Sequence, residues 1–217
     1  MRWANRALDE LRRRLAHGAH ASSRRTFLRD PYWREPLLAS IALRPHERIL
    51  DVGDSIAKLG PALSERSPET SVTTLYSGAE PANPAPRRSD SLRGTVTGPR
   101  SRPGDLPYPA VSFDKVVGAM AFYGLLPEEK LHLAREMHRV LRRGGTIYLA
   151  EMDRPENERE AHFLEVAAAT LGADRTAAHL DGTWSSVLSQ AGFVGIRRLS
   201  THSVMTARVA VVRSRRR

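Results

Sequence analysis

The sequence predicts an α/β fold: a doubly wound sheet of seven strands, mostly parallel, with helices on both faces and the last strand antiparallel. Apolar runs at 49–52, 116–121 and 146–151 are each short enough to be a buried strand. A helical pattern over 128–141 lies between the last two runs, with its apolar residues at helical spacing. Strands that alternate with helices in this way are typical of parallel sheets with helical crossovers.

The flanking segments fit the same plan. Residues 1–44 predict a helical lead-in over the sheet, with an amphipathic helix at 3–16 and a second helix at 34–43. The strands expected outside the central part of the chain are 72–76, 194–200 and 204–212.

The main domain, 45–213, is interrupted by a proline- and arginine-rich stretch. Residues 79–104 contain five prolines, five arginines and few apolar residues, which is typical of a long loop. A short strand at 92–96 is the most that this stretch can supply. The last residues, 214–217, predict a solvated, frayed basic tail.

Size and composition exclude several classes of protein. A chain of 217 residues that is 41% hydrophobic is long enough to bury a full core in one α/β domain. It contains no cysteine, which excludes disulfides, thiolate catalysis and cysteine zinc sites. No apolar run approaches the roughly 20 residues of a membrane span, and none resembles the apolar core of a signal peptide. We therefore expect a cytoplasmic protein without a membrane span.

The net charge of +10 has two interpretations. Three of the 34 basic residues are lysine and the rest are arginine, a skew typical of a GC-rich genome, and this is the interpretation that we favour. The alternative is an electrostatic surface for nucleic acid. The arginines are spread along the chain without the basic-aromatic pattern of an RNA-binding module, so nucleic acid is not the expected partner.

Two motifs carry a resemblance to a known family. Asp51-Val-Gly-Asp-Ser-Ile-Ala57 follows the first predicted strand and resembles the Asp-x-Gly-x-Gly-x-Gly loop of class I S-adenosylmethionine-dependent methyltransferases. Leu106-Pro-Tyr-Pro109, followed by Ser112-Phe-Asp114 and a buried strand, resembles the second signature of that family. The resemblance covers about 45–213 and is to the ubiquinone and menaquinone biosynthesis methyltransferases. It implies a Rossmann-like sheet, S-adenosylmethionine as cofactor and a small-molecule substrate.

The resemblance also implies where the cofactor would be held. Ligands of open α/β sheets lie beyond the carboxyl ends of the strands. The residues expected at these places are Asp51, Gly53, Asp54, Ser55, Tyr76, Leu106 and Met120.

The chain departs from the family pattern at three places. Ser55 and Ala57 replace two loop glycines, each adding a Cβ where a ligand would approach the backbone. Tyr76 stands where the family has an acidic residue that accepts hydrogen bonds from the ribose, and a single hydroxyl cannot hold a diol as a carboxylate does. The third departure is the 79–104 loop, because the family places a helix and a strand there.

Three residues are candidates for catalysis. Glu151, at the end of a predicted strand, is a candidate general base, and Tyr123 is a candidate hydrogen-bond donor to substrate. His179 lies in a predicted loop beside Leu180-Asp-Gly182, where relatives place substrate loops. Each has an alternative: Glu151 as a helix cap, Tyr123 as a cap on the core, and His179 as an exposed loop residue. No metal-ligand spacing is present, so no metal is expected.

Three functions remain open. The first is an active methyltransferase on a small molecule. The second is a methyltransferase-like protein that has lost cofactor binding and serves as partner or regulatory subunit of a homologous protein, in a homo- or hetero-oligomer. The third is a nucleic-acid-associated protein on the same fold, whose binding would depend steeply on salt.

Overall fold

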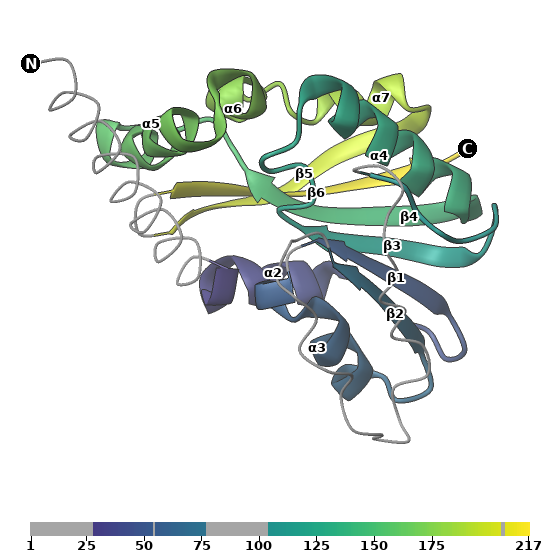
Figure 1. The fold of residues 1–217 in the computed structure, drawn as a ribbon. Helices are drawn as coiled ribbons and strands as arrows, with labels where there is room; N and C mark the ends of the chain where they lie inside the picture. The colour runs from purple at the N-terminus through teal and green to yellow at the C-terminus, as the bar shows by residue number, and fades with distance from the viewer. Residues whose placement is uncertain (1–27, 54, 77–103, 205–206) are drawn as a thin grey trace, which may run out of the picture.

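A computed structural model describes residues 28–53, 55–76, 104–204 and 207–217 of the chain. Its centre is one six-stranded sheet with the order β2-β1-β3-β4-β6-β5 (Figure 1). The strands are β1 Arg48–Gly53, β2 Ser71–Tyr76, β3 Phe113–Ala119, β4 Leu141–Met152, β5 Phe193–Val204 and β6 Ala207–Arg216. The helices are α2 Pro31–Ser40, α3 Leu59–Arg66, α4 Pro127–Val140, α5 Glu158–Leu171, α6 Ala173–Leu180 and α7 Ser186–Gln190, with a 3₁₀ turn η1 at Ser55–Ala57.

The predicted fold class is confirmed. Strands β2, β1, β3 and β4 are parallel, and β6 is antiparallel to both β4 and β5. Six strands lie within the described residues, so the seventh of the prediction is not confirmed. The expected helix at 3–16 and nearly all of the 79–104 loop lie outside the described residues. None of the described helices has both the length and the apolar character needed to cross a membrane.

Helices cover both faces of the sheet, α2 and α3 on one and α4 and α7 on the other (Figure 1). Because successive strand residues point to opposite faces, β4 divides its side chains between two cores. Tyr148, Ala150 and Met152 pack with α2, α3 and α5, whereas Ile147 and Leu149 pack with α4 and α7. The same alternation places Glu151 on the α4 face.

The prediction of a frayed tail at 214–217 is wrong. Strand β6 continues to Arg216, and Ser214 is buried with its hydroxyl donating to the carbonyl of Val194. The Arg216 guanidinium donates to the carbonyls of His138, Arg139 and Leu141 at the end of α4. The last carbonyls of a helix have no partner within the helix, and an arginine is well suited to bind them.

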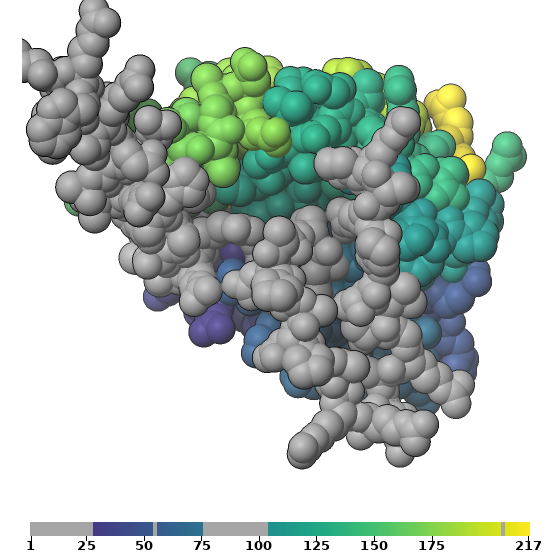
Figure 2. All heavy atoms as spheres, viewed as in Figure 1, coloured from purple at the N-terminus to yellow at the C-terminus, as the bar shows by residue number. Residues whose placement is uncertain are grey.

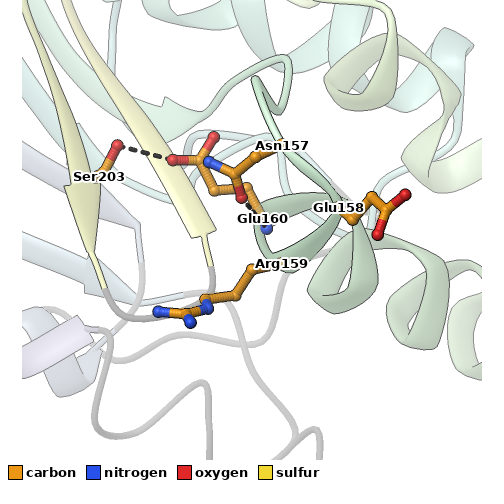
Figure 3. A pocket seen from close by; sticks show the side chains of 5 residues that line it. All are labelled: Asn157, Glu158, Arg159, Glu160 and Ser203. Atoms are coloured by element: carbon orange, nitrogen blue, oxygen red, sulfur yellow. Dashed lines mark hydrogen bonds between the residues drawn. The ribbon is translucent and has the colours of Figure 1, made fainter.

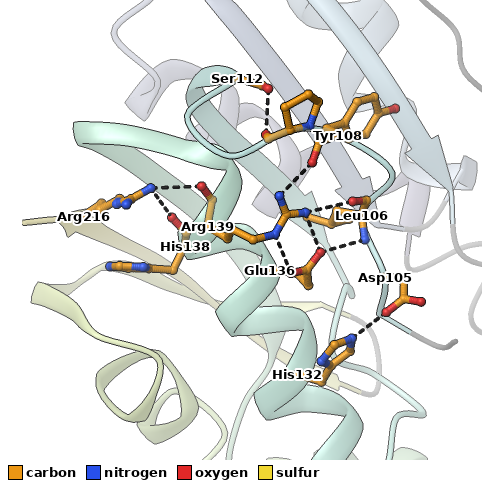
Figure 4. Close-up of polar contacts among 10 residues, drawn as sticks. Asp105, Leu106, Tyr108, Ser112, His132, Glu136, His138, Arg139 and Arg216 are labelled. Carbon is orange, nitrogen blue, oxygen red and sulfur yellow. Dashed lines mark hydrogen bonds and ion pairs between the residues drawn. The ribbon is translucent and has the colours of Figure 1, made fainter.

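The Leu-Pro-Tyr-Pro segment is held against α4 by one arginine (Figure 4). The Arg139 guanidinium donates to the carbonyls of Leu106 and Tyr108, at 3.0 and 2.8 Å, and to both oxygens of Glu136, at 2.6 and 2.7 Å. Glu136 in turn accepts the N–H of Leu106. These bonds satisfy the backbone of an irregular segment that would otherwise be left partly unpaired.

Val111, two residues before β3, has a strained backbone conformation. Its φ is +63°, in the left-handed region that a β-branched residue rarely adopts, and its side chain is 49% exposed. Its N–H donates to the carbonyl of Arg139 at 3.0 Å, so the turn is fixed by a bond that the side chain does not make.

We predict that Val111→Gly raises the free energy of unfolding by about 1 kcal/mol, because glycine adopts this φ without strain and little apolar contact is lost. Urea denaturation monitored by circular dichroism measures the change. Val111→Ala is the control, since it keeps a Cβ and should gain much less. A glycine variant no more stable than the alanine variant would contradict the prediction.

Candidate functional site

The loops after β1 and β3 diverge at the carboxyl edge of the sheet. The chain runs from β1 to β2 on one side of β1 and then returns to β3 on the other, which makes this edge the topological switch point where open α/β sheets bind ligands. Gly53 ends β1 against β3, and a Cβ there would lie 2.5 Å from the carbonyl oxygen of Ala119. Gly53 is therefore required by the contact between the two backbones.

Met120 continues the edge after β3. Its φ is +52°, uncommon for a residue with a side chain, and its N–H donates to the carbonyl of Ala150 at 2.8 Å. The side chain is buried at 4% exposure. On the other side of Gly53, the backbone of Tyr76 is its partner in β2. The structure thus brings Gly53, Met120 and the backbone of Tyr76 to one edge, as the sequence predicted for parallel strands.

The described part of the loop after Gly53 packs against the core and is bound by α2. Ala57 is buried at 1% exposure, and Ile56 packs against the same core. The Arg34 guanidinium of α2 donates to the carbonyls of Ala57 and Lys58, at 2.8 and 3.2 Å. Asp54 lies outside the described residues, as do the side chains of Ser55 and Tyr76.

Arg34 was not among the residues singled out from the sequence. It lies 24 residues before Lys58, on a helix whose local pattern gives no sign of this contact. A fold prediction that placed α2 over the first loop would have been needed to find it.

The Asp51 carboxylate points to the start of α3. Its side chain is buried, and Oδ2 accepts the N–H of Gly60 at 2.8 Å. Burial raises the pKa of this carboxyl to about 7, and the bond from Gly60 opposes that rise. A Cβ on Gly60 would meet Oγ1 of Thr74 at 2.4 Å, so Gly60 keeps α3 close to the sheet. The contact joins β1 to α3.

Leu106, also expected near the cofactor, has its side chain in the core on the α4 face, at 3% exposure. The backbone N–H and carbonyl of Leu106 are bound by Glu136 and Arg139. The contacts that the structure gives Leu106 therefore anchor its segment to α4.

Glu151 is fully buried on the α4 face. Its Oε1 accepts the N–H of Phe122 at 2.9 Å, and its Oε2 has no hydrogen-bond partner among the described residues. Burial raises the pKa of the carboxyl to about 8, opposed by the Phe122 N–H and by the charge of Lys130. Lys130 is buried as well, with Nζ donating to the carbonyl of Arg175 at 2.6 Å. Burial thus favours the protonated form of Glu151, and the bond from the Phe122 N–H ties Glu151 to the loop after β3.

His179 is neither in a loop nor exposed, so the predicted loop position and the alternative of an exposed loop residue are both wrong. It lies in the last turn of α6 with its side chain fully buried. Its Nδ1 is 3.0 Å from the carbonyl of Met152, and since a carbonyl can only accept, Nδ1 carries the hydrogen. Nε2 is then a bare acceptor, and it has no hydrogen-bond partner among the described residues. Burial lowers the pKa of His179 to about 4, and the charge of Lys130 acts in the same direction.

The structure brings the candidates Tyr123 and His179 together. Their ring centroids are 6.0 Å apart in an edge arrangement, and the ring of Trp184 is stacked with the imidazole at a centroid distance of 6.4 Å. Three consecutive residues at the end of β4 bind three different segments. The Glu151 carboxyl accepts the N–H of Phe122 in the loop after β3, and the carbonyl of Met152 accepts the hydrogen on Nδ1 of His179 in α6. The Asp153 carboxylate accepts the indole N–H of Trp184. In the sequence, Glu151 is a candidate only because it ends a predicted strand, and no local pattern indicates a role for Trp184.

A hollow at the start of α5 has three of its polar side chains bound within its own wall (Figure 3). It has a volume of about 550 Å³ and is lined by Asn157, Glu158, Arg159, Glu160 and Ser203. Asn157 caps α5 by accepting the N–H of Glu160, and Oε1 of Glu160 accepts the Ser203 hydroxyl at 2.6 Å. The described residues contain no group of three histidines or carboxylates able to hold a metal ion.

Comparison with known proteins adds family evidence. Residues 84–149 match the family model described as a methyltransferase domain. No curated protein matches the chain.

Solved structures match over most of the chain. A chain of the complex between the Haloferax volcanii Trm112 methyltransferase activator and the putative methyltransferase has a TM-score of 0.60 and 17% identity, covering 93% of this chain and 97% of that one. YcgJ from Bacillus subtilis has a TM-score of 0.59 and 15% identity, over 84% and 98%. Human N-acetylserotonin methyltransferase, solved in complex with S-adenosylmethionine, has a TM-score of 0.58 and 14% identity, over 84% and 51%.

These identities are low enough that the structural matches establish the fold alone. The matched part of the family model contains the Leu-Pro-Tyr-Pro segment, β3 and α4, and leaves out the loop after β1. The more specific assignment to the ubiquinone and menaquinone group is not confirmed. The resemblance to class I S-adenosylmethionine-dependent methyltransferases is confirmed, and the chain has their fold.

Proposed function

We propose that the protein is an S-adenosylmethionine-dependent methyltransferase acting on a small molecule. The observation that carries the proposal is the switch point, where Gly53, without a side chain, lies against β3 and the loops after β1 and β3 separate. Relatives of the same fold include a protein solved with S-adenosylmethionine and one solved with S-adenosylhomocysteine. Bound there, the cofactor supplies an activated methyl group.

The residues proposed to hold it are the backbone of Gly53 to Ala57 and the backbone at Met120, with the end of β2 at Tyr76 nearby. Methyl transfer needs mainly that donor and acceptor be held in line. The bonds from Arg34 serve this purpose by holding the backbone at Ala57 and Lys58, where the loop leads into α3.

The acceptor side is proposed to be the loop after β3. Phe122 is buried in the core, whereas Tyr123 is half-buried and borders His179. Tyr123 is the residue that we propose to contact substrate. Glu151 and His179 are fully buried and bind backbone groups, which favours a positioning role for both over direct proton transfer.

A second candidate function is a methyltransferase-like subunit that binds no cofactor. The burial of Ala57 in the core favours it, because its Cβ occupies a position that the family leaves open with glycine. A relative of the same fold was solved with an activator protein. A homologous protein is the partner that this candidate implies.

Calorimetric titration with S-adenosylmethionine and S-adenosylhomocysteine tests the proposal. We expect saturable binding in the micromolar range. Arg34→Ala should weaken binding about tenfold, because the loop carbonyls lose their donor. Arg48→Ala is the matched control, since Arg48 is exposed and begins β1 at the opposite end. It should bind as the unmodified protein does.

An absence of binding up to millimolar cofactor, in a chain that is folded by circular dichroism, would refute the enzyme proposal and favour the second candidate. Equal weakening by Arg34→Ala and Arg48→Ala would show that the loop is not the binding element.

A second prediction concerns pH. The folded protein holds a proton on Glu151 that the unfolded chain releases near pH 4.5, so the free energy of unfolding falls as pH rises from 4.5 toward 8 and levels off above 8. The raised pKa of Asp51 likewise makes the free energy of unfolding fall as pH rises from about 4 to about 7. His179 acts with the opposite sign, costing stability as pH falls from 6.5 toward 4.

Glu151→Gln should therefore flatten the loss of stability between about pH 5 and 8, while its amide oxygen still accepts the Phe122 N–H. Urea titrations at each pH measure this. Glu65→Gln, an exposed position on α3, should follow the unmodified protein. If Glu151→Gln loses stability as steeply as the control, Glu151 is already ionised in the folded protein.

A further inference from the structure

A second cavity lies just beyond the carboxyl end of β4. Its volume is about 570 Å³, and its walls come from the segment after β4, the loop after α6, and side chains of β5 and β6. Three arginines line it: Arg154, Arg198 and Arg208. Three carboxylates, Asp153, Glu156 and Asp181, line the same cavity. No step of the proposed methyl transfer uses the arginines.

Two of the arginines are oriented by carboxylates. Arg198 pairs with Asp153, which is 2% exposed and also accepts the indole N–H of Trp184 at 3.1 Å. A guanidinium has five N–H donors, so Arg198 keeps donors free after pairing. Arg208 pairs with Glu156, but the Arg208 side chain is 18% exposed and that of Glu156 is 66% exposed. The carboxylate is therefore the partner that can be displaced.

The third arginine, Arg154, makes no ion pair or hydrogen bond among the described residues. Its stem is confined by the loop after α6: a Cβ on Gly182 would lie 3.1 Å from Cβ of Arg154, and Gly182 has a φ of +79°. The remaining carboxylate of the cavity, Asp181, accepts both the N–H and the hydroxyl of Thr183, at 2.8 and 2.6 Å. Asp181 is thus bound within its own turn.

We propose that this cavity binds the oxyanion group, a carboxylate or a phosphate, of a small molecule, with Arg154 as the principal donor and Arg198 and Arg208 beside it. Guanidinium groups bind such anions with charge-assisted, often bidentate, hydrogen bonds. Asp153 connects the cavity through Trp184 and His179 to Tyr123. These contacts run through buried side chains, and the cavity lies at the same carboxyl edge of the sheet as the loop after β3, one strand away.

Under the proposed function, the ligand is an acceptor that carries an anionic group. This identification of the acceptor rests on the proposed function, whereas anion binding itself does not.

Titration of the full chain with inorganic phosphate, and separately with acetate, at constant ionic strength tests the inference. We expect saturable binding of at least one anion, and the arms of the experiment distinguish phosphate from carboxylate. Arg154→Gln should weaken it about tenfold. Arg143→Gln removes the same charge from an exposed residue near the start of β4, far along the strand from the cavity, and should bind normally.

A gain-of-binding variant sharpens the test. Glu156→Gln frees Arg208 and should tighten anion binding severalfold, whereas Glu65→Gln, with the same change of charge on α3, should not. The indole N–H resonance of Trp184 reports binding at the site and should shift with phosphate or acetate in the unmodified protein but not in Arg154→Gln.

Failure to saturate with either anion, or equal effects of Arg154→Gln and Arg143→Gln, would overturn the inference. S-adenosylmethionine titrations of the same variants separate it from the proposed function. Anion binding without cofactor binding would support the anion site and refute the methyltransferase proposal. Cofactor binding without anion binding would support the methyltransferase proposal and refute the anion site.

Discussion

The close contact between β1 and β3 is the constraint on which the carboxyl edge of the sheet depends. A side chain at Gly53 would strike the backbone of Ala119, and one at Gly118 would lie 2.3 Å from the carbonyl oxygen of Val52. Both glycines are thus demanded by packing within the sheet. Gly53, the one motif glycine that the chain keeps, is required by the packing of the sheet. The two replaced positions, Ser55 and Ala57, lie in η1, beyond this contact. The fold can therefore be kept although the cofactor loop has changed.

Buried ionisable groups determine how this edge is held together. Asp51 joins β1 to α3 on one face, and Glu151 joins β4 to the loop after β3 on the other. Both carboxyls have raised pKa values because burial disfavours their charged forms. Figure 2 shows the described surfaces of α4 and α6 along the top of the molecule. The side chains of Glu151, Lys130 and His179 are buried.

The sequence was sufficient for the features that local pattern determines. The helix expected at 128–141 is α4, and the antiparallel closing strand is β6, because apolar periodicity and turn residues are local signals. The site was harder to predict. Arg34, Arg139 and Trp184 act through contacts with segments far along the chain, and the burial of His179 depends on how α6 packs against the end of β4. The tail was predicted wrongly because composition does not show that Arg216 meets the end of α4.

The central claim is that a methyltransferase cofactor binds at the edge between β1 and β3 despite the changed loop. A crystal structure of the protein grown with S-adenosylhomocysteine tests it most directly. We expect the ligand to lie against the backbone of Gly53 and Met120, with the Arg34 bonds to the carbonyls of Ala57 and Lys58 intact. An empty edge at saturating ligand, or the ligand at another place on the molecule, would contradict it.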